Sequence, residues 1–313
     1  MDSASSTPKT PPPPLEGAVL PEREHRVDAH GAQLHVIEWG DPEAPPILCT
    51  HGMWDHAHCF DLLAPLLAER FRVVAFDARG HGDSSWADAY RWPDDVEDIL
   101  VMLDWLGRPA HLVGHSKGGG QATDATMLAE GRVRQLVNLD GFGPPEEGFT
   151  PPGREPMPVH LGPAERMEQY LDRRRGMATR SDWRPYPDVE ALIDRRSHQN
   201  PRLSREWLAY FSHFGARRDD DGWRWKSDPM AGWGFGPFRP DWIAPMWRHV
   251  KVPVLAVVGA EPDTWGPLPE PLLSDRLANF PDYERAVVPD SGHFMTIEQP
   301  RYVAGLILDF LEH

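Results

Sequence analysis

Short apolar runs that alternate with amphipathic helical segments constrain the fold of this chain more than any other feature. The runs ILCT, FRVVAFD, HLVGH, QLVNLD and VPVLAVVG are apolar throughout, and segments with helical periodicity separate them. Strands that are apolar on both faces are typical of a mostly parallel sheet covered by helices on both sides. The sequence therefore predicts an α/β fold with a mostly parallel central sheet.

A long insertion at residues 145–247 interrupts this alternation. It is rich in Pro, Trp and Arg, has helical patterns such as PAERMEQYLDRRR and SREWLAYF, and offers no convincing buried strand. Because a structureless loop of this length is uncommon in a compact domain, we expect an inserted helical cap that acts as a mobile lid. Residues 24–144 and 248–313 would form the core, and the proline-rich residues 1–23 a disordered tail.

Composition and charge exclude several classes of partner. The 32 Lys and Arg residues against 48 Asp and Glu residues give a net charge of −16, which repels a phosphate backbone, so no nucleic-acid partner is expected. No apolar run approaches the roughly 20 residues that span a bilayer, and the first residues lack the features of a signal peptide. Two cysteines are too few for a disulfide scaffold. We expect a cytoplasmic protein without a membrane partner, and the oligomeric state is not predicted.

A G-x-S-x-G motif lies between a predicted strand and a predicted helix, at Gly114-His115-Ser116-Lys117-Gly118. Such a motif places the serine on a sharp strand-to-helix turn, where small residues on either side allow the chain to approach itself closely. Ser116 is therefore the candidate nucleophile. The backbone N–H of Lys117, at the start of the helix, is a candidate donor to an oxyanion.

Three further segments complete the pattern. His51-Gly52-Met53 follows an earlier strand, and its Met53 N–H could supply a second oxyanion donor. The segment GAEPD ends a later strand at Asp263, and the segment SGHF, which contains His293, follows the last strand. The chain order is thus nucleophile, acid and base.

Together these segments resemble the α/β-hydrolase superfamily over residues 24–313, most specifically at FDARGHGDS (76–84) and the motifs above. The resemblance implies a cap between strands six and seven and an acyl transfer by Ser116, with His293 as the base. It offers two positions for the acid. Asp263 is preferred because its placement after strand seven is the more widespread pattern, and Asp140, after strand six, is the alternative. Lys117 stands where relatives more often have an apolar residue, which would put a cation beside the entrance.

The favoured function is hydrolysis of a carboxylic ester or lactone of a small apolar or aromatic molecule, without a cofactor or a metal. Epoxide hydrolases and haloalkane dehalogenases of this fold carry Asp where this chain has Ser116. The alternatives are a carbon–carbon bond hydrolase, a cofactor-free perhydrolase or a receptor-like protein that binds a small ligand. Trp54, Trp207 and Trp233 are candidates for the substrate pocket. We expect His115 to be a neutral core residue and HAHC at residues 56–59 not to bind a metal.

Overall fold

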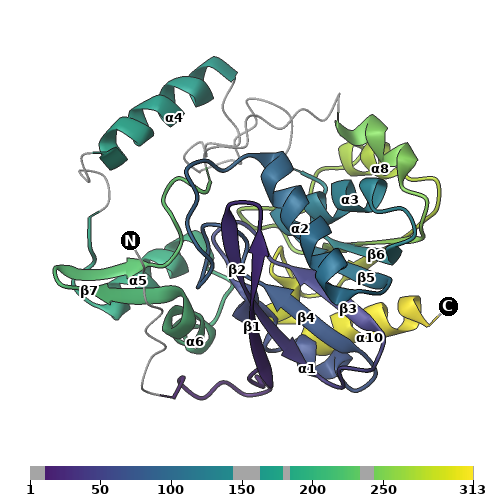
Figure 1. Cartoon of the computed structure of the whole chain (residues 1–313), viewed down its shortest axis with the longest axis horizontal. Helices are drawn as coiled ribbons and strands as arrows, with labels where there is room; N and C mark the ends of the chain where they lie inside the picture. The colour runs from purple at the N-terminus through teal and green to yellow at the C-terminus, as the bar shows by residue number, and fades with distance from the viewer. Residues whose placement is uncertain (1–10, 144–162, 179–183, 233–242, 313) are drawn as a thin grey trace.

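An eight-stranded sheet forms the centre of the molecule in the computed structural model, which describes residues 11–143, 163–178, 184–232 and 243–312 (Figure 1). The strand order is β1-β2-β4-β3-β5-β6-β9-β10. β1 and β2 pair antiparallel, β2 pairs antiparallel with β4, and all other neighbours are parallel. The strands are β1 (Arg23–Ala29), β2 (Ala32–Trp39), β3 (Pro46–Thr50), β4 (Arg72–Phe76), β5 (Ala110–His115), β6 (Val133–Leu139), β9 (Val254–Gly259) and β10 (Tyr283–Val288).

Helices cover both faces of this sheet, which confirms the predicted fold class. Because successive side chains of a strand point to opposite faces, Ile47 and Cys49 of β3 join one core cluster and Leu48 joins the other. The first cluster packs under η1 (Ala57–Phe60), α1 (Ala64–Leu67), α9 (Met295–Glu298) and α10 (Pro300–Leu311). The second packs under α2 (Trp92–Leu106), α3 (Lys117–Leu128), η3 (Ala244–His249) and α8 (Leu272–Leu277).

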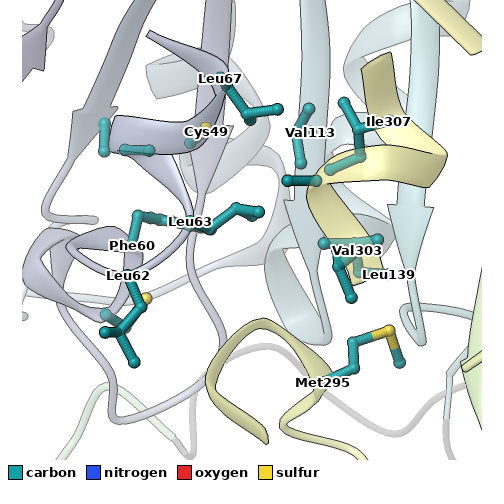
Figure 2. Packing of buried hydrophobic residues seen from close by; sticks show 14 of the residues in the cluster. Cys49, Phe60, Leu62, Leu63, Leu67, Val113, Leu139, Met295, Val303 and Ile307 are labelled. Atoms are coloured by element: carbon teal, nitrogen blue, oxygen red, sulfur yellow. The ribbon is translucent and has the colours of Figure 1, made fainter. Parts of the chain in front are cut away.

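The first cluster joins segments that are far apart in the sequence. Figure 2 shows Leu63 and Leu67 on one side and Val303 and Ile307 of α10 on the other, with Val113 of β5 between the two groups. All five side chains are fully buried. The carboxyl ends of β3, β5 and β6 lie next to each other in the sheet, so the loops that follow these strands meet at one edge.

The described part of the insertion, residues 163–178 and 184–232, is called the cap below. It contains α4 (Pro163–Ala178), α5 (Val189–Gln199) and α6 (Arg205–Gly215) and an antiparallel hairpin of β7 (Ala216–Asp219) and β8 (Gly222–Trp225). The Asp188 and Ser204 side chains cap α5 and α6 by accepting backbone N–H bonds. The hairpin was not predicted, because its short strands ARRD and GWRW lack an apolar run.

Polar contacts join the cap to the core at several points. The Tyr210 hydroxyl of α6 donates to the Asp61 carboxylate, and His56 stacks on Phe211 with ring centroids 4.1 Å apart. The Lys226 ammonium lies 2.8 Å from the Asp83 carboxylate. The prediction of a mobile lid is untested, but opening the cap at these points would expose buried polar and aromatic groups.

Two predicted boundaries differ from the structure. The Val19 N–H donates to Asp61 O at 3.0 Å, the Trp39 indole N–H donates to Val19 O at 2.9 Å, and Leu15 packs against the core. The expectation of a disordered tail through residue 23 is therefore wrong for residues 15–22, because proline content says nothing about such backbone pairing. The insertion was expected to end at residue 247, but Trp247 is buried and stacks on Phe280, so it belongs to the core.

A membrane-spanning helix is absent from the described ranges, since no helix there combines the necessary length and apolar character.

Candidate active site

Ser116 occupies a strained turn between β5 and α3. Its φ of 55° lies in the left-handed region that residues with a Cβ seldom adopt. The Ser116 N–H donates to Leu139 O at 2.9 Å, which holds the turn against β6. A Cβ on Gly114 would lie 2.6 Å from Gly119 Cα, and one on Gly118 would lie 2.5 Å from His51 O. The glycines of the motif are therefore required by close backbone approach, as the strand–turn–helix context predicts.

The imidazole of His293 is held by Asp140. Nδ1 of His293 lies 2.6 Å from Oδ2 of Asp140, and both side chains are buried. Asp140 follows β6 directly and has a φ of 53°. Because the carboxylate can only accept, Nδ1 carries the proton and Nε2 keeps a free electron pair in the neutral ring. Gly266 lies against the same carboxylate, where a Cβ would overlap Oδ2 of Asp140.

Asp263, the preferred acid, does not contact the imidazole nitrogens, so the preference was wrong at the level of geometry. Its Oδ2 accepts the backbone N–H of His293 at 2.6 Å. Its Oδ1 accepts the N–H groups of Trp265 at 2.7 Å and Gly266 at 3.1 Å. These bonds close an Asx-type turn after β9, and that turn directs the carboxylate to the backbone. The alternative acid, Asp140, is the residue that the structure brings to the ring.

The environment of His293 favours its protonated form. Burial lowers the pKa of this imidazole, but the hydrogen bond and charge of Asp140, with the charges of Asp263 and Asp55, raise it more, so the net direction is upward. His115, beside the nucleophile, behaves in the opposite way. Burial and the nearby His293 lower the pKa of His115 to about 4, so its ring is neutral, and its Nε2 lies 2.8 Å from His293 O. This agrees with the expected neutral core residue.

The loop after β3, residues Gly52–Asp55, is called the oxyanion loop because it contains Met53. A Cβ on Gly52 would lie 3.2 Å from Ser116 Cβ, so the loop lies directly against the nucleophile. The Asp55 N–H donates to Gly52 O at 3.3 Å and closes the turn. Trp54 has a φ of 62°, a conformation that costs a residue with a Cβ about 1–2 kcal/mol.

Lys117 is the first residue of α3, so its backbone N–H lies at the positive end of the helix dipole. Its side chain was expected to place a cation beside the entrance of the site, but it does not lie there. The ammonium lies 2.8 Å from Asp95 Oδ2, and 9% of the side chain is exposed. The acidic residue in the first turn of α2 draws the cation away from the surface.

Two tryptophans lie in a row beside the base. The Trp265 ring lies 6.2 Å from the His293 ring at an interplanar angle of 23°, and Trp54 meets Trp265 edge-on at 6.2 Å. Both are partly exposed. Trp265 was missed in the sequence, although its position two residues after a candidate acid was a usable signal. Trp207 is buried against Phe211 in the core cluster, so it is not exposed to a substrate, and Trp233 lies outside the described residues.

One three-residue group among the described residues has a spacing compatible with a metal ion, His35 with Asp77 and Asp83. Its atoms already have partners. Asp77 accepts from His35 at 2.9 Å and from the N–H groups of Ala57 at 2.7 Å and Asp83 at 2.8 Å, and Asp83 pairs with Lys226. The group therefore fastens the turn 76–84 to the neighbouring loops.

The comparisons with known proteins agree with this fold. A sequence model of the alpha/beta hydrolase family matches residues 47–306, more than half of the chain. The chain therefore belongs to the α/β-hydrolase family.

Individual relatives cover nearly the whole chain. A 3-hydroxybutyrate-oligomer hydrolase from Cupriavidus necator is 28% identical over 298 residues, which cover 91% of this chain and 93% of the relative. An esterase from Mycobacterium tuberculosis is 27% identical over 300 residues, or 94% of this chain and 90% of the relative. The solved thioesterase domain from the curacin biosynthetic pathway matches with a TM-score of 0.76 and 24% identity, over 92% of this chain and 99% of that domain. This last likeness shows the fold.

Proposed function

We propose that the protein is a serine hydrolase that cleaves a carboxylic ester of a small apolar or aromatic molecule through an acyl-enzyme. The observation that carries this proposal is the pairing of a strained Ser116 turn with a buried His293–Asp140 hydrogen bond of 2.6 Å. A hydrogen bond between the His115 side-chain Nε2 and the backbone oxygen of His293, at 2.8 Å, ties the residue next to the nucleophile to the base. These are the elements that activation of a serine requires.

In the proposed reaction, His293 Nε2 removes the proton from the Ser116 hydroxyl as its oxygen attacks the ester carbonyl. The Met53 and Lys117 N–H groups stabilise the negative oxygen of the tetrahedral intermediate. Asp140 holds the imidazole with its proton on Nδ1 and stabilises the imidazolium. The imidazolium returns its proton to the leaving alcohol, and water then attacks the acyl-enzyme by the same route.

The tryptophan row supports the proposed substrate class. Trp54 and Trp265 are partly exposed, Trp265 adjoins His293 and Trp54 adjoins Trp265, so the pair offers flat apolar surface that begins beside the base. The esterase from Mycobacterium tuberculosis among the relatives agrees with ester cleavage. Ser116 in the nucleophile position separates this chain from relatives that open epoxides through an aspartate.

Ser116→Ala tests the proposal. We expect the variant to lose at least three orders of magnitude in kcat for p-nitrophenyl acetate while its melting temperature stays the same, because removal of a nucleophile disables the whole unit. Ser274→Ala, on the exposed surface of α8, is the matched control and should keep full activity. Retention of more than a few per cent of activity in Ser116→Ala would contradict the assignment. A wild-type protein that cleaves a vinylogous diketone faster than any ester would move the reaction to carbon–carbon cleavage.

A further inference from the structure

A buried ion pair connects the cap to the oxyanion loop. Nη2 of Arg196, in cap helix α5, lies 2.5 Å from Oδ1 of Asp55, the last residue of the loop. The two residues are 141 positions apart, and both side chains are buried, at 7% and 3% exposure. A buried pair of this kind contributes little net stability, because desolvation offsets most of the attraction. Its value to the protein must therefore be sought in the geometry that it fixes.

The Asp55 carboxylate lies at the inner side of the loop. Oδ1 faces Arg196, and Oδ2 lies 3.9 Å from Nδ1 of His115, the neighbour of the nucleophile. A Cβ on Gly52 would lie 3.0 Å from Oδ2 of Asp55 and 3.2 Å from Ser116 Cβ. The Gly52 backbone thus lies between the Asp55 carboxylate and the nucleophile. A shift of Asp55 would therefore move the loop relative to Ser116.

The loop also needs an external anchor. Trp54, which precedes Asp55, has a left-handed backbone conformation, and such conformations persist only where surrounding contacts fix them. The internal bond of the turn, from the Asp55 N–H to Gly52 O, is long at 3.3 Å. Arg196 is itself held by packing, since its guanidinium lies 5.2 Å from the centre of the Phe211 ring in α6. The anchor is therefore fixed by two cap helices.

We propose that Arg196 is a positioning residue for the oxyanion loop: through Asp55 it fixes the direction of the Met53 N–H, so that the oxyanion site is complete only when cap helix α5 is in place. This inference rests on the proposed function and adds that the position of the cap determines whether the oxyanion site is complete. Arg196 does not touch the reacting atoms in this mechanism. It acts through the Asp55 carboxylate and the strained turn.

The test compares Arg196→Met with Lys226→Met. Both substitutions remove a cap cation that pairs with a core carboxylate, but the Lys226 partner is Asp83, outside the oxyanion loop. For the small ester p-nitrophenyl acetate, we expect Arg196→Met to lower kcat about 10- to 100-fold with less than a threefold change in KM. This is a fraction of the 10²- to 10³-fold effect of losing an oxyanion donor. Lys226→Met should stay within threefold of wild type.

Two further readouts separate positioning from a general structural role. A trifluoromethyl ketone, which forms a hemiketal oxyanion with the serine, should bind Arg196→Met more weakly by the same factor as the loss of kcat. The acid limb of the kcat/KM profile should not move to lower pH, because Asp140 still holds His293 and the Asp55 charge, which raises the pKa of His293, loses its cationic partner. Equal losses in both cation variants, or a loss confined to KM, would overturn the proposal.

Folding and the proposed function are controlled separately. If Arg196→Met does not fold, Arg196→Lys, which keeps the charge but not the planar fork, is judged by the same criteria. If wild type hydrolyses no ester, the proposed function fails, and amide hydrogen exchange in residues 52–55 then decides the inference. Faster exchange there in the Arg196 variant, but not in Lys226→Met, supports coupling of α5 to the loop, and unchanged exchange refutes it.

Discussion

Asp140 lies at a chemically decisive position, directly after β6, the last core strand before the insertion. Its carboxylate is the partner of His293 Nδ1, and Asp263 binds backbone N–H groups instead. Asp140→Asn should lower kcat by about 10³- to 10⁴-fold, because the amide holds the imidazole in the wrong tautomer. Asp263→Asn should cost no more than about tenfold. Steady-state kinetics on one ester checks both, and a larger loss in the Asp263 variant would return the acid role to that residue.

The pH dependence of activity follows from the same residue. As the base, His293 must be neutral, so kcat/KM should fall on the acid side of a pKa that lies above 6.5. The Asp140 carboxylate is the strongest of the contributions that raise this pKa. In Asp140→Asn the residual activity should therefore show its acid limb at lower pH than wild type. An acid limb at the same pH in Asp140→Asn and wild type would mean that the kcat/KM profile reports the titration of a group other than His293.

The sequence does not show which aspartate holds His293, because the choice depends on local turn geometry. Asp140 and Asp263 both follow buried strands, and their roles depend on how the next residues turn. Asp140 has a φ of 53°, and the turn from Asp263 to Gly266 closes on the carboxylate of Asp263 itself. Ser116 and His293, in contrast, stand in motifs whose spacing specifies the turn, and the structure places both where the sequence predicted. Long-range contacts such as Asp55 with Arg196 leave no local pattern.

At the scale of elements, helix α6 shows how an aromatic residue can be misinterpreted. Trp207 was a candidate for the pocket, but it lies on the inner face of α6, stacked on Phe211 at 4.8 Å. Trp207→Ala should destabilise the fold by about 3–5 kcal/mol, as is usual when a buried aromatic ring is removed. Denaturant unfolding measures this loss. Ratios of kcat/KM between short and bulky esters should stay unchanged, and a changed ratio would restore Trp207 to the pocket.

Trp54 and Trp265 are expected to behave differently from Trp207, because both are partly exposed, with Trp265 beside the base and Trp54 against Trp265. Trp265→Ala should reduce kcat/KM for aryl-acyl esters by at least tenfold more than for p-nitrophenyl acetate, since only the larger acyl group can lie against the ring. A uniform loss against every ester would show that the ring merely supports His293. The five apolar runs named in the sequence are the strands β3, β4, β5, β6 and β9 of the core. The hairpin β7–β8 was not predicted, because paired short strands need no apolar run.

At the scale of the whole molecule, buried neutral histidines make stability depend on pH. The pKa values of His111 and His115 are both lowered to about 4, mainly by burial, and burial also lowers those of His51, His56 and His81. The unfolded chain, with ordinary values near 6.5, binds more protons between about pH 6.5 and 4, so stability should fall as the pH drops through that range. His35 and His293, with raised pKa values, act in the opposite direction: their contribution is present below pH 6.5 and is lost as the pH rises through their folded-state pKa.

The net effect can be measured by denaturant unfolding at pH 7 and pH 5. We expect a decrease of a few kcal/mol at pH 5, at about 1.4 kcal/mol per pKa unit for each group. His111→Gln, on β5 and away from the site, should reduce this decrease, while His30→Gln, at an exposed turn, should not. Equal pH dependence in wild type and His111→Gln would show that His111 does not contribute.

The pairing of Val19 with Trp39 has a practical consequence for handling the protein. The amino-acid composition suggests a shortened protein that begins at residue 24. Such a protein would lack Val19, which accepts the Trp39 indole N–H and donates its backbone N–H to Asp61 O. The Asp61 carboxylate accepts a hydrogen bond from the Tyr210 hydroxyl of α6. Loss of the Val19 bond to Asp61 would therefore also weaken the contact between core and cap. Affinity tags and fusion partners therefore belong upstream of residue 15, where the chain makes no such bond among the described residues.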